Sequence, residues 1–333
     1  MAQGILETYR ERIEYGLARA LRGDAPLRSL LRYHVGLEND GGTPARATGK
    51  LLRPSLVLFV AEQLGADPER ALPSAVALEL IHGFSLIHDD IQDRDRVRRG
   101  RPAVWTICGP DQAINAGDLM HALAVSTALD SSPDAANCLI RATQEMIEGQ
   151  SHDLEFERRE VTGDEYLEMI DRKTGALLRC AFELGGIAAG INGNVRSALI
   201  GLGQAVGRAF QIRDDFLGVW GSDDVLGKAT GSDLRRRKKS LPVVLLFERA
   251  ESDEVAVLQR LYGQDANPEN GIAASDVEWI VARLDAHDVR EACEEMIRNH
   301  LSQAHGRLRE LPFAAGARAR MEELIEFLAR RET

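Results

Sequence analysis

Cysteine is scarce in this chain of 333 residues, and no pattern puts the cysteines to use. The four residues of this type, Cys108, Cys138, Cys180 and Cys293, lie far apart and form no CxxC pair. That spacing argues against a zinc site and against a disulfide framework. We therefore expect reduced, small, buried side chains and a cytoplasmic location.

The chain also lacks an excess of positive charge, a secretory signal and a long apolar run. Its 52 acidic residues outnumber its 41 lysines and arginines, a balance that argues against nucleic acid as a partner. The opening MAQGILETYRERIEYGL acquires charge too early for a secretory signal. No apolar run approaches the roughly 20 residues that a membrane helix requires. We expect no stable membrane insertion.

Strand-like alternation of β-branched residues is rare, and a helical period dominates instead. Ile5, Tyr9, Ile13 and Leu17 recur at every fourth position, which places them on one face of a helix. The best strand candidate is the stretch LPVVLLF at 241–247, which could equally open a buried helix. Glycine, proline and aspartate clusters predict loops at 39–49, 100–110, 130–137 and 219–233.

No linker rich in proline or serine divides the chain. The composition, 44% hydrophobic and 28% charged, is that of an ordinary globular protein with a sizeable core. Seven glycines between residues 185 and 207 would let helices approach closely or leave volume between them. We predict an all-α fold, in which residues 1–333 form a single-domain helical bundle around a deep central cavity.

The stretch HDDIQDRDRVRRGRP, residues 88–102, contains four aspartates and five arginines, with the acids leading and most of the bases following. On a helix, Asp89 and Asp93 stand one turn apart with Asp90 beside them, and like charges at that spacing repel. Mg²⁺ removes the repulsion, because it takes carboxylate oxygens and shares them with substrate phosphates. The alternative is a solvated acidic face, but the apolar run before these residues favours a buried helix.

A second pair, Asp214 and Asp215, follows another helix of apolar and small residues. Two such clusters far apart in the chain could face each other across a bundle, as helical metal sites do. The second cluster is incomplete, because Gly218 stands where a DDxxD motif would place its last aspartate.

Basic residues accompany both clusters. The adjacent Arg98 and Arg99 could hold a diphosphate by two-point hydrogen bonds. Lys50 lies just before an expected helix, and Arg53 lies at its start beside Pro54. The N-terminus of a helix is a suitable place to bind an anion. Each base alone could be a solvated side chain. Together with the acids they indicate a substrate system with two diphosphates, and the further bases are Lys173, Lys228 and the run RRRKKS at 235–240.

Six blocks of the sequence, in order, resemble the motifs of the trans-isoprenyl diphosphate synthases, also called polyprenyl synthetases. The resemblance runs from about Gly49 to Pro242. The blocks are GKLLRP, LIHGFSLIHDDIQDRDRVRRGRPAVW, EMIEGQSHDLEFE, KTGALL, FQIRDDFLG and LGKATGSDLRRRKKSLP. The family condenses isopentenyl diphosphate with an allylic diphosphate by head-to-tail prenyl transfer, uses Mg²⁺ and usually forms homodimers.

The resemblance implies roles for individual residues. Those expected to hold Mg²⁺, up to three ions per site with Mn²⁺ as a substitute, are Asp89, Asp93, Asp214 and, as supporting members, Asp90 and Asp215. The isopentenyl diphosphate site would comprise Lys50, Arg53, His82 and Arg99. The allylic diphosphate would be bound by Arg98, Lys173, Lys228 and Lys238. The residues near the reacting carbocation, beside Lys173, would be Thr174 and Gln211.

Departures from the family pattern occur at two of these motifs. Gly218 is expected to lower metal affinity without abolishing activity, and Leu51 replaces a usual basic residue.

Product length is expected to depend on the residues one turn before the first aspartates. Phe84, with the small Ser85 beside it, lies five residues and about 7 Å of helix before Asp89. In the family, an aromatic residue there resembles the geranylgeranyl (C20) type, with farnesyl (C15) as the next product. The alternative is that Phe84 only packs the core, because helical geometry turns it about 140° from Asp89.

Two other classes of protein stay open. A class I terpene cyclase also uses DDxxD, but it needs no second diphosphate site, and its NxxxSxxxE-type motif is not visible here. A non-catalytic partner subunit would be expected to lose acids of the first motif, whereas this chain keeps all three and only Gly218 points that way.

Overall fold

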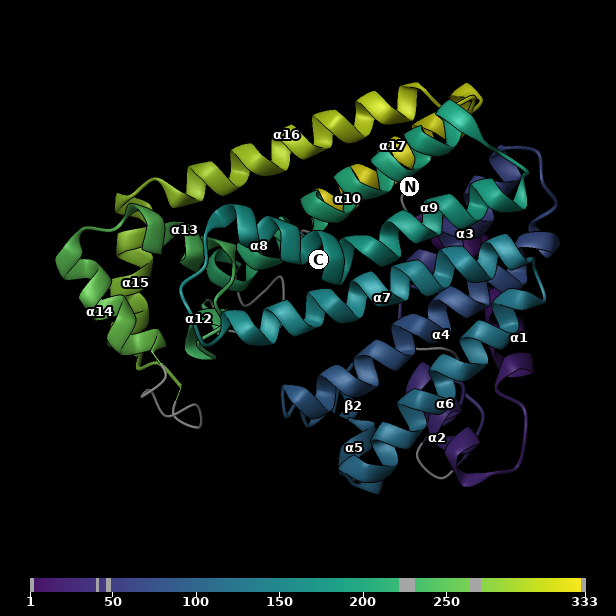
Figure 1. Cartoon of the computed structure of the whole chain (residues 1–333), viewed down its shortest axis with the longest axis horizontal. Coiled ribbons are helices and arrows are strands. Elements are labelled where there is room, and N and C mark those ends of the chain that lie inside the picture. Colours follow the sequence, from purple (N-terminus) through teal and green to yellow (C-terminus); the bar gives the residue numbers. More distant parts are fainter. Residues whose placement is uncertain (1–2, 40–41, 46–48, 222–230, 264–270, 331–333) are drawn as a thin grey trace. The chain divides into compact units, whose positions relative to one another are not determined.

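A computed structural model describes residues 3–39, 42–45, 49–221, 231–263 and 271–330 of the chain. Helices account for most of the regular structure in these ranges (Figure 1). In chain order they are α1 (Gln3–Ala20), α2 (Pro26–Val35), α3 (Leu52–Gln63), α4 (Pro68–Gln92), α5 (Val104–Cys108), α6 (Pro110–Leu129), α7 (Pro133–Phe156), α8 (Gly163–Ile170), the π-helix η1 (Asp171–Gly175), α9 (Ala176–Ala188), α10 (Gly193–Trp220), α12 (Ser232–Arg235), α13 (Leu241–Arg249), α14 (Ser252–Tyr262), α15 (Ala274–Ala286), α16 (Val289–Arg309) and α17 (Ala315–Arg330). The strands β1 (Val97–Arg98) and β2 (Arg101–Pro102) form a short antiparallel hairpin.

The chain divides into two compact units. The first comprises residues 1–144, 177–200 and 308–324, and the second comprises residues 145–176, 201–307 and 325–333. The expectation of one domain over residues 1–333 stays a prediction. Each unit carries one of the two adjacent aspartate pairs, which are Asp89 and Asp90 in the first unit and Asp214 and Asp215 in the second.

Helix α4 packs against α3 and α6 and carries the first aspartate pair at its end. Asp67 starts the helix by accepting a hydrogen bond from the Glu69 backbone at 3.0 Å, and Pro68 follows in the first turn. By length and composition α4 is apolar enough to cross a membrane, which differs from the expectation drawn from the sequence. In the structure, 67% of that apolar stretch is buried, as in the core helix of a globular unit.

Three of the predicted loops are partly helical. Residues 104–110 contain α5 and the start of α6, and α7 begins at Pro133. The predicted loop 219–233 contains the end of α10 and the start of α12, and its residues 222–230 lie outside the described ranges. In α6 and α7 the helix opens with proline, whose fixed φ and missing N–H suit a first turn. Proline was therefore a helix start where the sequence suggested a loop. The ambiguous stretch 241–247 likewise opens helix α13.

The helical repeat and the glycine-rich stretch are borne out in the first unit. Ile5, Tyr9, Ile13 and Leu17 are all buried. A Cβ atom on Gly185 of α9 would lie 2.6 Å from the Val60 Cβ of α3, so this glycine permits close helix contact.

We expect Gly185→Ala to lower the free energy of unfolding by about 1–3 kcal/mol, because the added methyl group overpacks the contact with α3. Denaturant unfolding measures the change. Gly316→Ala is the matched control, because a Cβ there meets nothing within 4 Å, and its effect should stay within about 0.5 kcal/mol. Equal losses in the two variants would contradict the close approach.

Candidate functional site

The three aspartates of the first motif, Asp89, Asp90 and Asp93, lie where α4 ends. The backbone N of Asp93 donates to the carbonyl of Asp89 at 2.8 Å, which keeps the two residues one turn apart as their spacing predicted. Asp93 caps α4 and is not a member of it. Asp89 is partly exposed and Asp93 is exposed, whereas Asp90 is buried. The neighbouring carboxylates therefore have different surroundings.

Asp90 is paired with one of the predicted diphosphate-binding bases. Its side chain is 1% exposed and accepts hydrogen bonds from Nε of Arg98 at 2.8 Å and from Nη2 of the same residue. Burial raises the pKa of Asp90, and Arg98 opposes that rise. Breaking a buried ion pair leaves an uncompensated charge, so the carboxylate fixes the guanidinium in place. The supporting role in metal binding expected for Asp90 stays a prediction.

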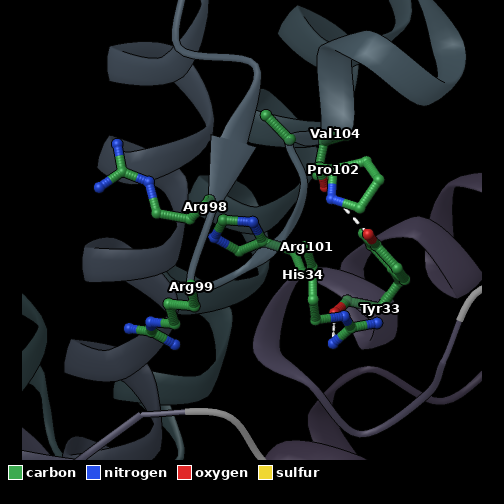
Figure 2. Close-up of a pocket in the computed structure, with 8 residues that line it drawn as sticks. Tyr33, His34, Arg98, Arg99, Arg101, Pro102 and Val104 are labelled. Carbon is green, nitrogen blue, oxygen red and sulfur yellow. Dashed lines mark hydrogen bonds between the residues drawn. The ribbon is translucent and has the colours of Figure 1, made fainter. Parts of the chain in front are cut away.

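Arg98 and Arg99 belong to the hairpin that follows α4. Tyr33 of α2 donates its hydroxyl to the Pro102 carbonyl at 2.9 Å, and Arg101 donates to the Tyr33 carbonyl at 3.1 Å. The guanidinium of Arg101 also lies 3.9 Å from the centroid of the Tyr33 ring. These contacts fasten the hairpin to α2, and Figure 2 shows Arg98 and Arg99 pointing away from Tyr33.

A small pocket opens beside this hairpin (Figure 2). His34 lies among its three arginines, and burial together with those guanidiniums lowers the pKa of His34 to about 3. The imidazole is therefore neutral at neutral pH. The pocket residues are Tyr33, His34, Arg98, Arg99, Arg101, Pro102, Ala103 and Val104.

The loop before α3 lies directly against Arg99. Gly49 has a φ of +125°, and a Cβ atom there would lie 2.8 Å from Nη1 of Arg99. This conformation favours glycine, and the absence of a side chain leaves room for the Arg99 guanidinium. Lys50 follows on the exposed side of the loop, and Leu51 is buried in a left-handed conformation at the start of α3. A lysine or arginine at 51 would have to leave that buried position.

Arg53 and His82, the other two residues of the predicted isopentenyl diphosphate site, lie in one electrostatic cluster with Arg99. Nη1 of Arg53 is 3.3 Å from Nε2 of His82. Burial lowers the pKa of His82 well below its usual range, and Arg53 and Arg99 lower it further. His82 therefore acts as a neutral hydrogen-bonding group. Burial raises the pKa of Glu79, and the positive charges of Arg99 and Arg53 oppose that rise. This carboxyl group was not identified from the sequence.

Phe84 is buried between α4 and α6. Its ring centroid lies 4.9 Å from that of His88 and 5.3 Å from that of His121. The hydroxyl of Ser85 donates to the His82 carbonyl at 2.9 Å. Core packing of Phe84 is thus observed, and its control of product length stays a prediction.

In the second unit, Lys173 and Thr174 lie on the π-helix η1. Nζ of Lys173 forms an ion pair with Asp153 of α7. Oγ1 of Thr174 donates to Oε1 of Gln211 on α10 at 2.8 Å. The sequence suggested all three site residues, and Asp153 was present in the EGQSHDLEFE block without a role. A π-helix is rare and often marks a functional site.

The second aspartate pair repeats the arrangement of the first. Asp214 is partly exposed, whereas Asp215 is fully buried. Asp215 accepts hydrogen bonds from the Tyr166 hydroxyl at 2.7 Å, from Nζ of Lys238 at 3.2 Å and from Nε2 of Gln211 at 3.2 Å. Burial opposes the charge of Lys238, but Asp215 and nearby carboxylates raise its pKa overall. Asp215 therefore fixes Lys238 as Asp90 fixes Arg98.

The space beside Gly218 is filled by another carboxylate. A Cβ atom at 218 would lie 2.3 Å from Oδ2 and 2.5 Å from Cγ of Asp233 on α12. Oδ2 of Asp233 also accepts from Nζ of Lys238 at 3.3 Å. An aspartate at 218 would thus collide with Asp233. The incomplete motif has a structural reason, which the sequence alone did not reveal.

Backbone strain is concentrated at the predicted site residues. Left-handed conformations of residues other than glycine are uncommon and persist where function requires them. Within the described ranges such residues are Leu51, Arg94, Arg99, Arg237 and Asp288. Arg99 is itself a predicted site residue. Leu51, Arg94 and Arg237 are the sequence neighbours of the predicted site residues Lys50, Asp93 and Lys238.

The carboxylates suit a hard divalent cation that is shared with substrate. In the parts of the chain that the structure covers, no group of three or more histidine, cysteine or acidic side chains could hold a metal alone. Mg²⁺ commonly takes one or two carboxylates and completes its shell with water and phosphate oxygens. The donors with solvent access are Asp89, Asp93 and Asp214. Lys228, a predicted ligand of the allylic diphosphate, lies outside the described residues.

The family model for polyprenyl synthetases matches residues 42–277. The chain belongs to this family, as its motifs indicated. A crystal structure of polyprenyl synthetase from Streptomyces coelicolor A3(2) is 35% identical and superposes with a TM-score of 0.90, covering 98% of this chain and 99% of that one. The predicted all-α class is confirmed.

Two relatives from Mycobacterium tuberculosis (strain ATCC 25618 / H37Rv) have assigned activities. A (2E,6E)-farnesyl diphosphate synthase is 46% identical over 67% of this chain and 64% of its own length. A geranylgeranyl diphosphate synthase is 40% identical over 77% of this chain and 74% of its own length. The chain thus matches less than two thirds of the length of the first of these relatives.

We expect Gly218→Ala to disturb Lys238, because the new methyl group must displace Asp233, whose carboxylate contacts that lysine. Affinity for a diphosphate, measured by calorimetry with inorganic pyrophosphate and Mg²⁺, should fall about 10-fold, as for loss of one charge-assisted hydrogen bond. Gly306→Ala, on α16 in open space, serves as the control. Unchanged affinity in Gly218→Ala would contradict the role of Asp233.

Proposed function

We propose that this protein is a short-chain trans-prenyl diphosphate synthase. It condenses isopentenyl diphosphate with an allylic diphosphate and releases diphosphate. The observation that carries the proposal is that the two aspartates of each pair differ in burial and in their partners. Asp90 and Asp215 are buried against a base, while Asp89 and Asp214 keep access to solvent.

The basic residues of the first unit support a separate site for isopentenyl diphosphate. Arg53, His82 and Arg99 share one cluster, and Gly49 brings the loop with Lys50 against Arg99. A terpene cyclase would have no use for this cluster. We assign the diphosphate of the acceptor to Lys50, Arg53, His82 and Arg99.

The allylic diphosphate is assigned to bases that carboxylates hold in fixed positions. We assign it to Arg98, Lys173 and Lys238, which are paired with Asp90, Asp153 and Asp215, and we add Lys228 from the resemblance. Fixed cations stabilise charge that develops on the leaving group without reorganising during the reaction.

The same residues account for the chemical steps. The allylic C–O bond breaks and its electron pair stays on the diphosphate, where Arg98 and Lys238 stabilise it. The double bond of isopentenyl diphosphate then attacks the allylic carbon, and the proton lost from its C2 passes to the diphosphate. Thr174 and Gln211 present oxygen atoms near the carbocation. Apolar walls must exclude water, which would otherwise capture that cation.

Asp89, Asp93 and Asp214 are the proposed ligands of Mg²⁺, with up to three ions per site and Mn²⁺ as a substitute. When bound, the ions neutralise diphosphate charge and so assist its departure. Their carboxylates supply the oxygen donors that this cation prefers. Asp90 and Asp215 support them by orienting neighbouring bases.

We propose geranylgeranyl diphosphate as the main product, with farnesyl diphosphate next. Phe84 is the proposed end of the chain-binding space, and Ser85 lies beside it. We also propose a cytoplasmic homodimer of single-domain subunits. The exposed apolar side chains of Ile107, Ile114 and Leu129 on α5 and α6 would suit a second copy of the chain.

The proposal is tested by incubating the protein with Mg²⁺, isopentenyl diphosphate and each of the C5, C10 and C15 allylic diphosphates. Mass spectrometry should detect longer prenyl diphosphates only when isopentenyl diphosphate is present. A cyclic hydrocarbon formed without it would indicate a cyclase. Absence of turnover in every mixture would indicate a partner subunit.

Asp89→Ala should abolish turnover, with a loss in kcat of about 1,000-fold or more, because a carboxylate that holds the metal at the leaving group is removed. Initial rates with saturating substrates measure the loss. Asp111→Ala, an exposed acid in the first turn of α6, should retain the normal rate. A near-normal rate for Asp89→Ala would refute the metal assignment.

Phe84→Ala should lengthen the product by at least one isoprene unit, because the cavity it leaves extends the space before Asp89. The chain length of the products is read by mass spectrometry. Phe59→Ala removes a buried ring of α3 and should lower stability without changing the product. If Phe84→Ala leaves product length unchanged, Phe84 has only a packing role.

A further inference from the structure

The turn that carries Lys173 and Thr174 adopts the π-helical form in η1. Such turns are rare, and their presence raises the question of what holds them. Resting on the function proposed above, we infer that Asp171 and Gly149 are positioning residues. They hold η1 in its π-helical shape and thereby place Lys173 and Thr174 for reaction of the allylic diphosphate.

Asp171 anchors the first residue of η1 to α10. Its carboxylate accepts from Nε of Arg208 at 2.7 Å, from Nη2 of the same residue, and from Nε2 of Gln204 at 3.1 Å. A two-point pair between guanidinium and carboxylate fixes orientation as well as distance. The side chain of Asp171 is 13% exposed, so solvent screens this pair less than a surface pair.

Gly149 allows the other side of η1 to lie against α7. A Cβ atom at 149 would lie 2.3 Å from the backbone N of Lys173 and 2.8 Å from the carbonyl carbon of Arg172. These are backbone atoms, which cannot turn aside as the end of a flexible side chain can. Any residue larger than glycine must therefore push η1 away from α7.

Two side-chain contacts depend on this placement. Lys173 pairs with Asp153 of α7, and Thr174 donates to Gln211 of α10. Gln211 donates in turn to Asp215, which connects η1 to the second aspartate pair. A change from π-helical to α-helical spacing would rotate Lys173 and Thr174 relative to these partners. Asp171 and Gly149 prevent that rotation, and we propose no contact between them and the substrate.

The first test replaces Asp171 by asparagine, which keeps the shape and removes the charge. We expect kcat/KM for the allylic diphosphate to fall about 10- to 100-fold, as for a misplacement of about 1 Å. KM for isopentenyl diphosphate should stay unchanged. The control is Glu254→Gln, because Glu254 pairs with Arg283 in the same unit and is 12% exposed, close to the value for Asp171. It should leave both KM values and kcat unchanged.

The second test replaces Gly149 by alanine and uses Gly306→Ala as its control, a helical glycine whose Cβ would meet nothing within 4 Å. As in Asp171→Asn, we expect Gly149→Ala to lower kcat/KM for the allylic substrate and to leave KM for isopentenyl diphosphate unchanged. Amide hydrogen exchange over residues 171–176 should accelerate in Asp171→Asn and Gly149→Ala, and in neither control.

The outcomes separate positioning from general destabilisation. If kcat falls only by the fraction of protein that unfolds, with both KM values unchanged, the inference is wrong. It is also wrong if both variants match wild type, or if exchange over residues 171–176 is unaltered. Failure of the wild-type protein to turn over any substrate would refute the proposed function instead, and exchange over residues 171–176 would then decide the inference alone.

Discussion

Two adjacent carboxylates cannot lie side by side on a helix without compensation, and this constraint applies to both aspartate pairs. In each pair one aspartate is buried and neutralised by a base from farther along the chain. Asp90 takes Arg98, 8 residues later, and Asp215 takes Lys238, 23 residues later. Leaving the buried acid unpaired would cost much free energy, because its charge would be uncompensated. The pairing therefore holds the base in position. The other acid of each pair keeps solvent access and the lone pairs that a cation requires.

The surrounding structure also holds the basic side chains in place. The hairpin that carries Arg98 and Arg99 is fastened to α2 through Arg101 and Tyr33, and Gly49 brings the next loop against Arg99. Asp233 fills the space that Gly218 leaves and also accepts a hydrogen bond from Lys238. Left-handed backbone and a π-helix occur beside these residues, and both are conformations that ordinary packing disfavours. Conformational strain is thus concentrated where charged groups must be held in place.

Much of this could be predicted from the sequence, because it depends on local patterns. The four-residue repeats indicated helices, and the order of six motifs indicated the family. What failed depends on contacts between distant residues. No local pattern indicated that Asp90 pairs with Arg98 or that Asp215 pairs with Lys238. The contacts of η1 with Gly149 and Arg208, and the close approach of Asp233 to Gly218, likewise join residues far apart in the chain. The sequence around Pro110 and Pro133 predicts loops, whereas both residues begin helices, because the same local pattern suits a loop and a first helical turn.

The central claim is that the acids within each pair have different tasks, and a crystal structure with Mg²⁺, isopentenyl diphosphate and a non-cleavable allylic diphosphate analogue tests it most directly. The account predicts cations on Asp89, Asp93 and Asp214, with Asp90 still bound to Arg98 and Asp215 still bound to Lys238. Cations on Asp90 or Asp215 with those ion pairs broken, or no cation at either pair, would contradict it.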